Sequence, residues 1–208
     1  MKKLLYLFFL ISFFGYSQTQ ITDANFDTAI NTCLTTNPVD GLCSDSEYGA
    51  MPDWDVSNVT NMGAMFEYAS SFNADISNWD VSSVTNMSNM FANASSFNRD
   101  LSNWDISSVT DMKVMFAYAS SFNQSLNDWE TSNVTDMYAM FAYASSFNGD
   151  ISNWDVSSVN NMSNMFSYAS SFNGDISNWD VSRITNMSTM FTNASSFNQP
   201  LNDWDVSS

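Results

Sequence analysis

Hydrophobic and polar positions repeat along most of this chain with a period of 25 residues. Tryptophan marks the period, at Trp54, Trp79, Trp104, Trp129, Trp154, Trp179 and Trp204, with no insertion or deletion between them. In most units a Trp-Asp-Val-Ser segment leads into Val-Thr-Asn-Met, Met-Phe and Ala-Ser-Ser-Phe-Asn, and an Ile or Leu precedes the next Trp. So strict a period is typical of an array of stacked repeats rather than of one globular domain.

These motifs resemble the repeat of the BspA-like bacterial surface proteins, which are relatives of the leucine-rich repeats. The matching residues are the W-D-V-S-x-V-T-N-M core and the following M-F-x-x-A-S-S-F-N, and the resemblance covers about Met51 to Ser208. It implies a right-handed, leucine-rich-repeat-like solenoid on a secreted or cell-surface protein of a kind often assigned to adhesion. It does not imply a particular ligand.

Each coil is expected to contain one short parallel strand and several tight turns. The Trp-Asp-Val-Ser segment alternates apolar and polar residues, which predicts a strand. From Val59 to Ile76 the apolar residues follow mostly at intervals of three or four, which favours helical or 3₁₀ turns. Stacked coils then place like residues in buried columns of Trp, Val, Met, Phe, Ala and Ile or Leu. The methionine columns that begin at Met62 and Met65 are interpreted as core, with a soft binding groove as the alternative.

The chain before the repeats has two predicted parts. Lys2-Lys3 and the apolar run Leu4 to Phe14 predict a signal peptide over residues 1–17, cleaved near Ser17. The run is too short to span a bilayer, so no membrane insertion is expected after cleavage.

Residues 18–50 are predicted to form an N-terminal helical cap on the stack. Phe26, Ile30, Cys33 and Leu34 share one helical face, and Thr22 or Asp23 is the expected N-cap. In an exported protein, Cys33 and Cys43 are expected to form a disulfide. Residues 51–208 hold six full repeats and part of a seventh, so we expect the natural protein to continue.

Composition and charge restrict the function. The 22 acidic and 5 basic side chains give a net charge of −17, which disfavours nucleic acid and anionic lipid as partners. The chain has no histidine, and no catalytic or nucleotide-binding motif occurs. Paired carboxylates leave a two-acid glycosidase open on residue type alone, but every acid of the coils belongs to the repeat. We therefore expect no enzyme and no cofactor, apart from Ca²⁺ as an open alternative.

Two faces of the expected coils are candidate sites. The first is an acidic column, in which like charges must be offset by hydrogen bonds or by bound Ca²⁺; it comprises Asp55, Asp80, Asp105, Glu130, Asp155 and Asp180. The second is a tyrosine column at a variable position, with aromatic rings suited to stacking on a sugar or peptide, or to covering apolar edges between coils; it comprises Tyr68, Tyr118, Tyr143 and Tyr168.

The sequence favours an adhesion-type interaction module that is secreted or held at the bacterial cell surface. Its partner is expected to be a protein or a glycan. The main alternative is a structural spacer or stalk that displays another domain. A weaker alternative is a calcium-binding surface scaffold.

Overall fold

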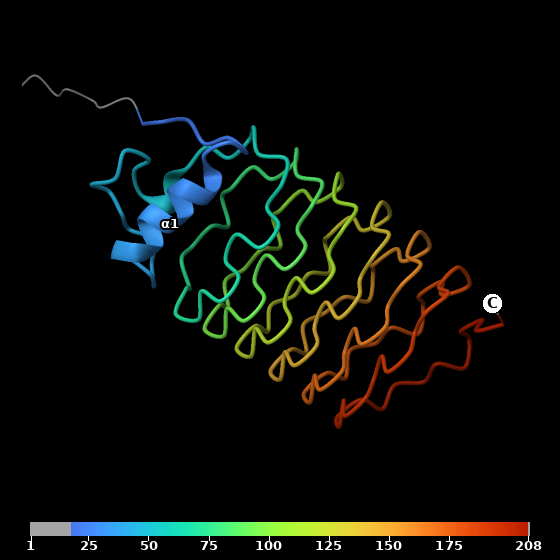
Figure 1. Cartoon of the computed structure of the whole chain (residues 1–208). Helices are drawn as coiled ribbons and strands as arrows, with labels where there is room; N and C mark the ends of the chain where they lie inside the picture. The colour runs from blue at the N-terminus through green and yellow to red at the C-terminus, as the bar shows by residue number, and fades with distance from the viewer. Residues whose placement is uncertain (1–17, 208) are drawn as a thin grey trace, which may run out of the picture.

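The structure is a computed structural model that describes residues 18–207. After a short N-terminal region, the chain winds through coils that lie side by side in a single stack, with the C-terminus at the end opposite the helix (Figure 1). Within the described residues, the regular elements are α1, Phe26–Thr36, and the 3₁₀ helix η1, Met51–Asp53. The predicted signal peptide lies outside the described residues.

The predicted fold class was wrong in its secondary structure. No strand occurs within residues 18–207, and the β-pairing between neighbouring coils consists of isolated parallel bridges, from Asn61↔Asn86 to Asn161↔Asn186. A leucine-rich-repeat-like solenoid with one strand and helical turns in each coil is therefore not what the chain forms. The bridges recur every 25 residues, so the repeat itself is retained.

The expected strand fails because its backbone N–H groups find partners within their own coil. In the second unit the N–H of Trp79 donates to the C=O of Ile76 at 3.1 Å, and the N–H of Ser82 donates to the Asp80 carboxylate at 3.1 Å. Short polar side chains that bond the nearby backbone compete with sheet hydrogen bonds in this way. The Trp-Asp-Val-Ser segment is consequently a sequence of turns.

The coils are held together by hydrogen bonds from alternate residues of one variable segment. In the first coil, Ala64, Phe66 and Tyr68 donate their N–H groups to carbonyls of the second coil at 2.8–2.9 Å. The intervening N–H groups close turns within the coil, as from Glu67 to Ala64 at 3.0 Å. Because of this alternation, the backbone N–H groups of the segment are hydrogen-bonded although no continuous β-ladder forms.

The apolar columns predicted from the period are buried. Trp, Val, Met, Phe and Ile or Leu side chains of the middle coils are 0–5% exposed, and exposure rises at the ends of the stack, at Met65 in the first coil and at Phe191, Phe197 and Trp204 at the other end. The phenylalanines form two adjacent stacks, with ring centroids 5.4 Å apart between Phe66 and Phe91 and 4.0 Å apart between Phe66 and Phe72. The methionine columns belong to the same core, as predicted.

From Trp104 onward, each buried tryptophan also joins two coils through its indole nitrogen. The Nε1–H of Trp104 donates to the C=O of Ile76 at 3.1 Å, and Trp129 and Trp154 repeat the bond with Leu101 and Leu126. Indole N–H groups need such partners when buried. Tryptophan therefore fixes the register of the stack as well as filling it.

The helix α1 covers the first coil. Its Phe26 ring lies 6.4 Å from Trp54 and 5.8 Å from Trp79, and Ala29, Ile30 and Cys33 are also buried. The predicted N-cap was wrong, because the helix begins after Asn25, whose side chain accepts the N–H of Thr22.

Candidate functional site

The face that carries the variable positions is built from successive β-turns. In the first coil the N–H of Met65 donates to the C=O of Met62, and Ala64 at the third position of the turn has a φ of 61°. A positive φ at this position alone defines a type II turn, which normally takes Gly or Asn there. Tyr68 occupies the same position in the turn that follows, with a φ of 62°.

This left-handed conformation recurs in all six coils and is adopted by unfavourable residue types. Within residues 18–207, the non-glycine residues with positive φ are Ala64, Tyr68, Asn89, Asn93, Val114, Tyr118, Ala139, Tyr143, Asn164, Tyr168, Thr189 and Asn193. Asparagine tolerates the conformation, whereas other side chains lose roughly 1–2 kcal/mol through the clash of Cβ with the backbone. The cost is greatest for the β-branched Val114 and Thr189.

Three of the predicted tyrosines form a continuous stack on this face. The ring centroids of Tyr118 and Tyr143 are 4.4 Å apart with an interplanar angle of 6°, and those of Tyr143 and Tyr168 are 4.5 Å apart with the same angle. Their exposed fractions are 48%, 39% and 42%. Tyr68 is 71% exposed and lies apart, because Asn93 replaces tyrosine in the intervening coil.

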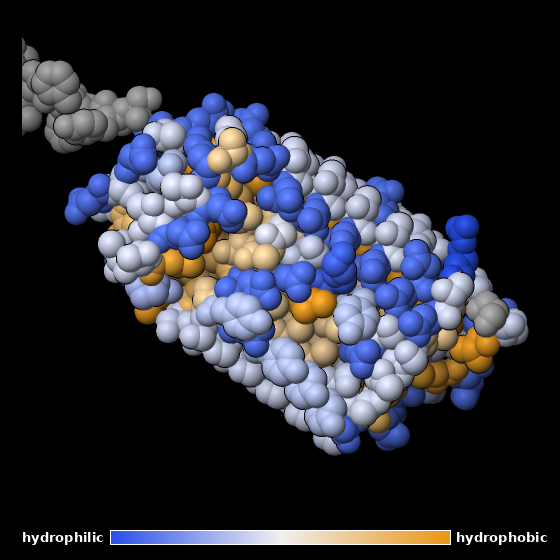
Figure 2. All heavy atoms as spheres, viewed as in Figure 1, coloured by the Kyte–Doolittle hydropathy of each residue, from blue (hydrophilic) through white to orange (hydrophobic). Residues whose placement is uncertain are grey.

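The tyrosine stack forms one side of a shallow groove of about 380 Å³, which we call the tyrosine groove. Its lining also includes Val114, Tyr138, Asn164, Thr189 and Thr192. The small side chains of Ala117, Ala139, Ala142 and Ser167 are buried and form its floor. Ala117, Ala139 and Ala142 make an apolar cluster separate from the core, and Val114 contacts it. Figure 2 shows apolar surface on the viewer's side of the middle coils, between rows of hydrophilic side chains.

The groove carries no ionisable side chain other than its tyrosine phenols. Burial, followed by the effect of the neighbouring phenols of Tyr118 and Tyr168, raises the pKa of Tyr143 above its ordinary value of 10.0. The Tyr143 phenol is therefore neutral at physiological pH. On a chain with a net charge of −17, this is a locally uncharged surface.

The acidic column lies on an exposed face and is held by local hydrogen bonds. The carboxylate of Asp105 accepts the Ser107 hydroxyl at 2.6 Å and the Ser107 N–H at 3.1 Å, and Asp55 and Ser57 are arranged alike. These bonds from Ser107 lower the pKa of Asp105 below its ordinary value. The serine two residues after each of these aspartates thus supplies hydrogen-bond donors of the kind expected to offset the repulsion between the like charges of the column.

The described part of the chain has no group of three acidic, cysteine or histidine side chains arranged to hold a metal ion. A calcium site at the acidic column stays a prediction from the sequence alone.

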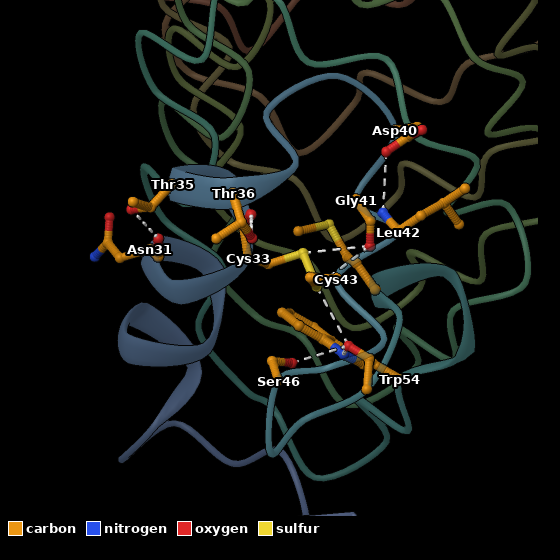
Figure 3. The surroundings of a disulfide bond; sticks show 12 residues. Asn31, Cys33, Thr35, Thr36, Asp40, Gly41, Leu42, Cys43, Ser46 and Trp54 are labelled. Carbon is orange, nitrogen blue, oxygen red and sulfur yellow. Dashed lines mark hydrogen bonds between the residues drawn. A yellow bond between two sulfur atoms is a disulfide. The ribbon is translucent and has the colours of Figure 1, made fainter.

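The disulfide between Cys33 and Cys43 is confirmed. Their Cα atoms are 5.2 Å apart, and the bond ties the end of α1 to the loop before η1. Trp54 lies beside that loop, where its Nε1–H donates to the C=O of Gly49 at 3.0 Å (Figure 3). The disulfide therefore fixes the cap against the first tryptophan of the array.

The structure thus brings together only part of the predicted tyrosine column, and it adds residues that were not predicted as site residues. The floor residues Ala117 and Ala142 lie in a column that was not considered. The sequence did contain a signal for this column, because the residues directly before the tyrosine position have small side chains, as at Ala92, Ala117 and Ala142.

A search for known relatives found a family. The family model described as "Mycoplasma protein of unknown function, DUF285" matches residues 41–143 and 125–208. The chain matches no curated protein and no solved structure. Separately, within residues 18–207 no helix is both long and apolar enough to cross a membrane.

Proposed function

This chain belongs to the family of Mycoplasma proteins of unknown function, DUF285, and on that premise we propose that it is a non-enzymatic interaction module that binds a ligand in the tyrosine groove. The resemblance of the repeat to BspA-like surface proteins supports an adhesion-type role. The disulfide supports export from the cell, since disulfides persist in oxidising compartments. The location is accordingly secreted or cell-surface.

The observation that carries the proposal is the presence of tyrosine at left-handed positions. The same chain places Asn93 and Asn193 at the equivalent position of other coils, so asparagine fits the backbone there. Tyr118, Tyr143 and Tyr168 adopt the conformation at a higher cost. Strain of this kind is typical of functional sites, where the side chain is retained for a purpose other than folding.

Stacking between the tyrosines returns part of this cost. Each aromatic pair contributes about 0.5–1.5 kcal/mol beyond its buried area. Two pairs contribute about 1–3 kcal/mol, whereas three left-handed residues cost about 3–6 kcal/mol, so stacking offsets only part of the strain. Stability alone therefore gives little reason to prefer tyrosine over asparagine at these positions.

The lining of the groove supports binding rather than catalysis. It includes no carboxylate, histidine, lysine or cysteine that could act as a general acid, a base or a nucleophile. A volume of about 380 Å³ lies within the range of ligand sites. The side chains offer hydroxyl and amide groups next to apolar methyl groups.

The second candidate is a spacer that only separates another domain from the cell. The regular stack of coils favours it, since such arrays are extended and each coil contacts only its neighbours. A spacer needs no uncharged groove and no strained tyrosines, so it does not account for them.

Binding by matched variants tests the proposal. The triple variant Y118N/Y143N/Y168N removes the stack, and Tyr68→Asn makes the same exchange outside the groove. Wild-type protein and Tyr68→Asn are expected to bind the same surface glycans or proteins in an array and pull-down screen, and the triple variant is expected to lose that binding. A screen in which the triple variant retains every partner, or in which the wild type has none, contradicts the proposal and leaves the spacer.

A further inference from the structure

We infer that the ligand of the tyrosine groove is an uncharged linear glycan that lies along the stack, across successive coils. This inference rests on the function proposed above and specifies the class of ligand. It is based on three features of the groove: the absence of cationic side chains, the hydroxyl groups of its lining, and backbone N–H groups that are already hydrogen-bonded.

The absence of cationic side chains from the groove, together with the net negative charge of the chain, disfavours anionic ligands. The groove lining includes no lysine, arginine or histidine, so the groove has no cationic partner for a sulfate, a carboxylate or a phosphate. The chain as a whole carries −17, which repels polyanions over distances of about 10 Å at physiological ionic strength. Lys113, which precedes the groove residue Val114 in the chain, already pairs with Asp111 at 2.8 Å. A sialylated, sulfated or uronic-acid glycan is therefore disfavoured.

The lining offers polar groups for the hydroxyls of a neutral sugar and apolar groups for the C–H face of its ring. The hydroxyl groups of Ser167 and Thr192 can donate to and accept from sugar hydroxyls, and the NH₂ of Asn164 can donate to them. The Thr189 hydroxyl already donates to Asn164 Oδ1 at 2.7 Å, so it can act toward a sugar only as an acceptor. The methyl groups of Ala117 and Ala142 offer an apolar floor for the C–H face of the ring. Phenol hydroxyls add further donors at the edge.

The orientation of the tyrosines determines how a ligand meets them. Each face of Tyr143 is covered by a neighbouring tyrosine, so its ring edge and hydroxyl are what a ligand can reach. A ligand therefore lies against a row of edges and hydroxyls that continues from coil to coil. An extended chain follows such a row better than a single planar ring does.

The backbone of the groove cannot bind a peptide by strand addition. That mode needs unpaired N–H and C=O groups along an edge. Here the N–H groups of Tyr118, Tyr143 and Tyr168 donate to the next coil at 2.7–2.8 Å. Those of Ala117 and Ala142 close turns within their own coils at 3.1 Å. A glycan, which is recognised through side chains, is compatible with these occupied N–H groups.

A glycan array tests the inference directly. The folded chain is applied to printed neutral linear glycans built from glucose, galactose, mannose or N-acetylglucosamine, and to sialylated, sulfated and uronic-acid glycans. We expect neutral chains to bind, with affinity rising with length until the glycan spans the groove. Tyr68→Asn should bind as the wild type does, whereas Y118N/Y143N/Y168N should bind at least tenfold more weakly.

The outcomes separate this inference from the proposed function. Groove-dependent binding of anionic glycans overturns the inference but leaves an interaction module. The same holds if no glycan binds and a purified protein partner is lost on the triple substitution. Absence of any groove-dependent partner overturns both.

Discussion

Single side chains complete the stack where a neighbouring coil is missing. In successive coils the N–H of one threonine donates to the C=O of the threonine before it, as from Thr85 to Thr60 at 2.9 Å. Thr60 has no coil before it, and the Asp23 carboxylate accepts its N–H at 2.8 Å, its hydroxyl at 2.6 Å and the Asn61 N–H at 3.1 Å. Asp23 was expected to cap the helix, but it caps the first coil instead.

Replacing Asp23 should destabilise the cap in a pH-dependent way. Burial raises the pKa of Asp23, but the hydrogen bonds from Thr60 and Asn61 outweigh it and bring the pKa below 3.8. The stability from the ionised group is therefore present above pH 3.8 and lost as the pH falls through the lower folded pKa. Asp23→Ala should reduce the free energy of unfolding by about 1 kcal/mol at pH 7.

Urea unfolding at pH 7 and pH 3 measures this effect. Asp23→Asn is the matched control, because its oxygen can still accept the two N–H groups, and it should lose less. A penalty for Asp23→Ala that is as large at pH 3 as at pH 7 would show that the carboxylate charge has no part in the cap.

Lys113 offsets the one pair of neighbouring carboxylates in the bridge column. Asp111 and Asp136 face each other across a parallel bridge, and the other positions of this column are asparagine. The Lys113 ammonium lies 2.8 Å from Asp111, and the hydrogen bond to Asp111 raises the pKa of Lys113. Its stabilisation is thus present below pH 10.5 and lost as the pH rises through the higher folded pKa.

Lys113→Met should lower the free energy of unfolding by about 0.2–1 kcal/mol, and more at low salt than at high salt. Asp136→Asn in the Lys113→Met background should restore most of the loss, because the repulsion is then removed. Thermal melts at two salt concentrations measure both variants. Equal losses at both salt concentrations would contradict the electrostatic role assigned to the Lys113 ammonium.

At the scale of elements, each coil depends on side-chain ladders as much as on its backbone. The Oδ1 of Asn123 accepts the N–H of Asn148 in the next coil at 2.7 Å, and its own N–H donates to Asn98 at 2.9 Å. The same bond recurs in every coil from Asn73 onward. The asparagine of the Ser-Ser-Phe-Asn motif thus satisfies a backbone N–H group in one coil after another.

Removing one member of this ladder should cost a single hydrogen bond. Asn123→Ala leaves the Asn148 N–H without its acceptor and should reduce the free energy of unfolding by about 1 kcal/mol. Asn123→Asp keeps an acceptor in place and should lose less. Chemical denaturation of both variants decides the matter, and equal losses would show that the amide acts by another contact.

The sequence predicts the buried columns of these coils but not their backbone conformation. The 25-residue period identifies the buried Trp, Met and Phe columns, because identical residues in register can only stack. The missing strands were not predictable from Trp-Asp-Val-Ser, because its alternation suits a strand. The structure shows that the N–H of Ser82 donates to the Asp80 carboxylate instead of to a neighbouring strand. Left-handed residues were signalled at Asn89 and Asn93 but not at Val114 or Tyr118, where hydrogen bonds between coils override local preference.

At the scale of the whole molecule, the chain separates a uniform interior from one variable face. The core columns repeat with little change, and the cap closes one end through Phe26 and Asp23. Variation is concentrated beside the tyrosine groove, at positions such as Lys113, Tyr138 and Ser163. The candidate site could be predicted as a tyrosine column, but its extent could not, because the stacking order and the alanine floor depend on how the turns place each side chain.

The central claim is that the groove tyrosines are retained for binding and not for folding. The most direct test is the free energy of unfolding of Y118N/Y143N/Y168N, measured by urea denaturation beside Tyr68→Asn and the wild type. Relief of strain at three residues, about 3–6 kcal/mol, is at least as large as the loss of two ring pairs, about 1–3 kcal/mol, so the triple variant should lose no more than about 1 kcal/mol relative to the wild type. A loss of about 3 kcal/mol or more would show that the tyrosines hold the coils together, and would contradict the account.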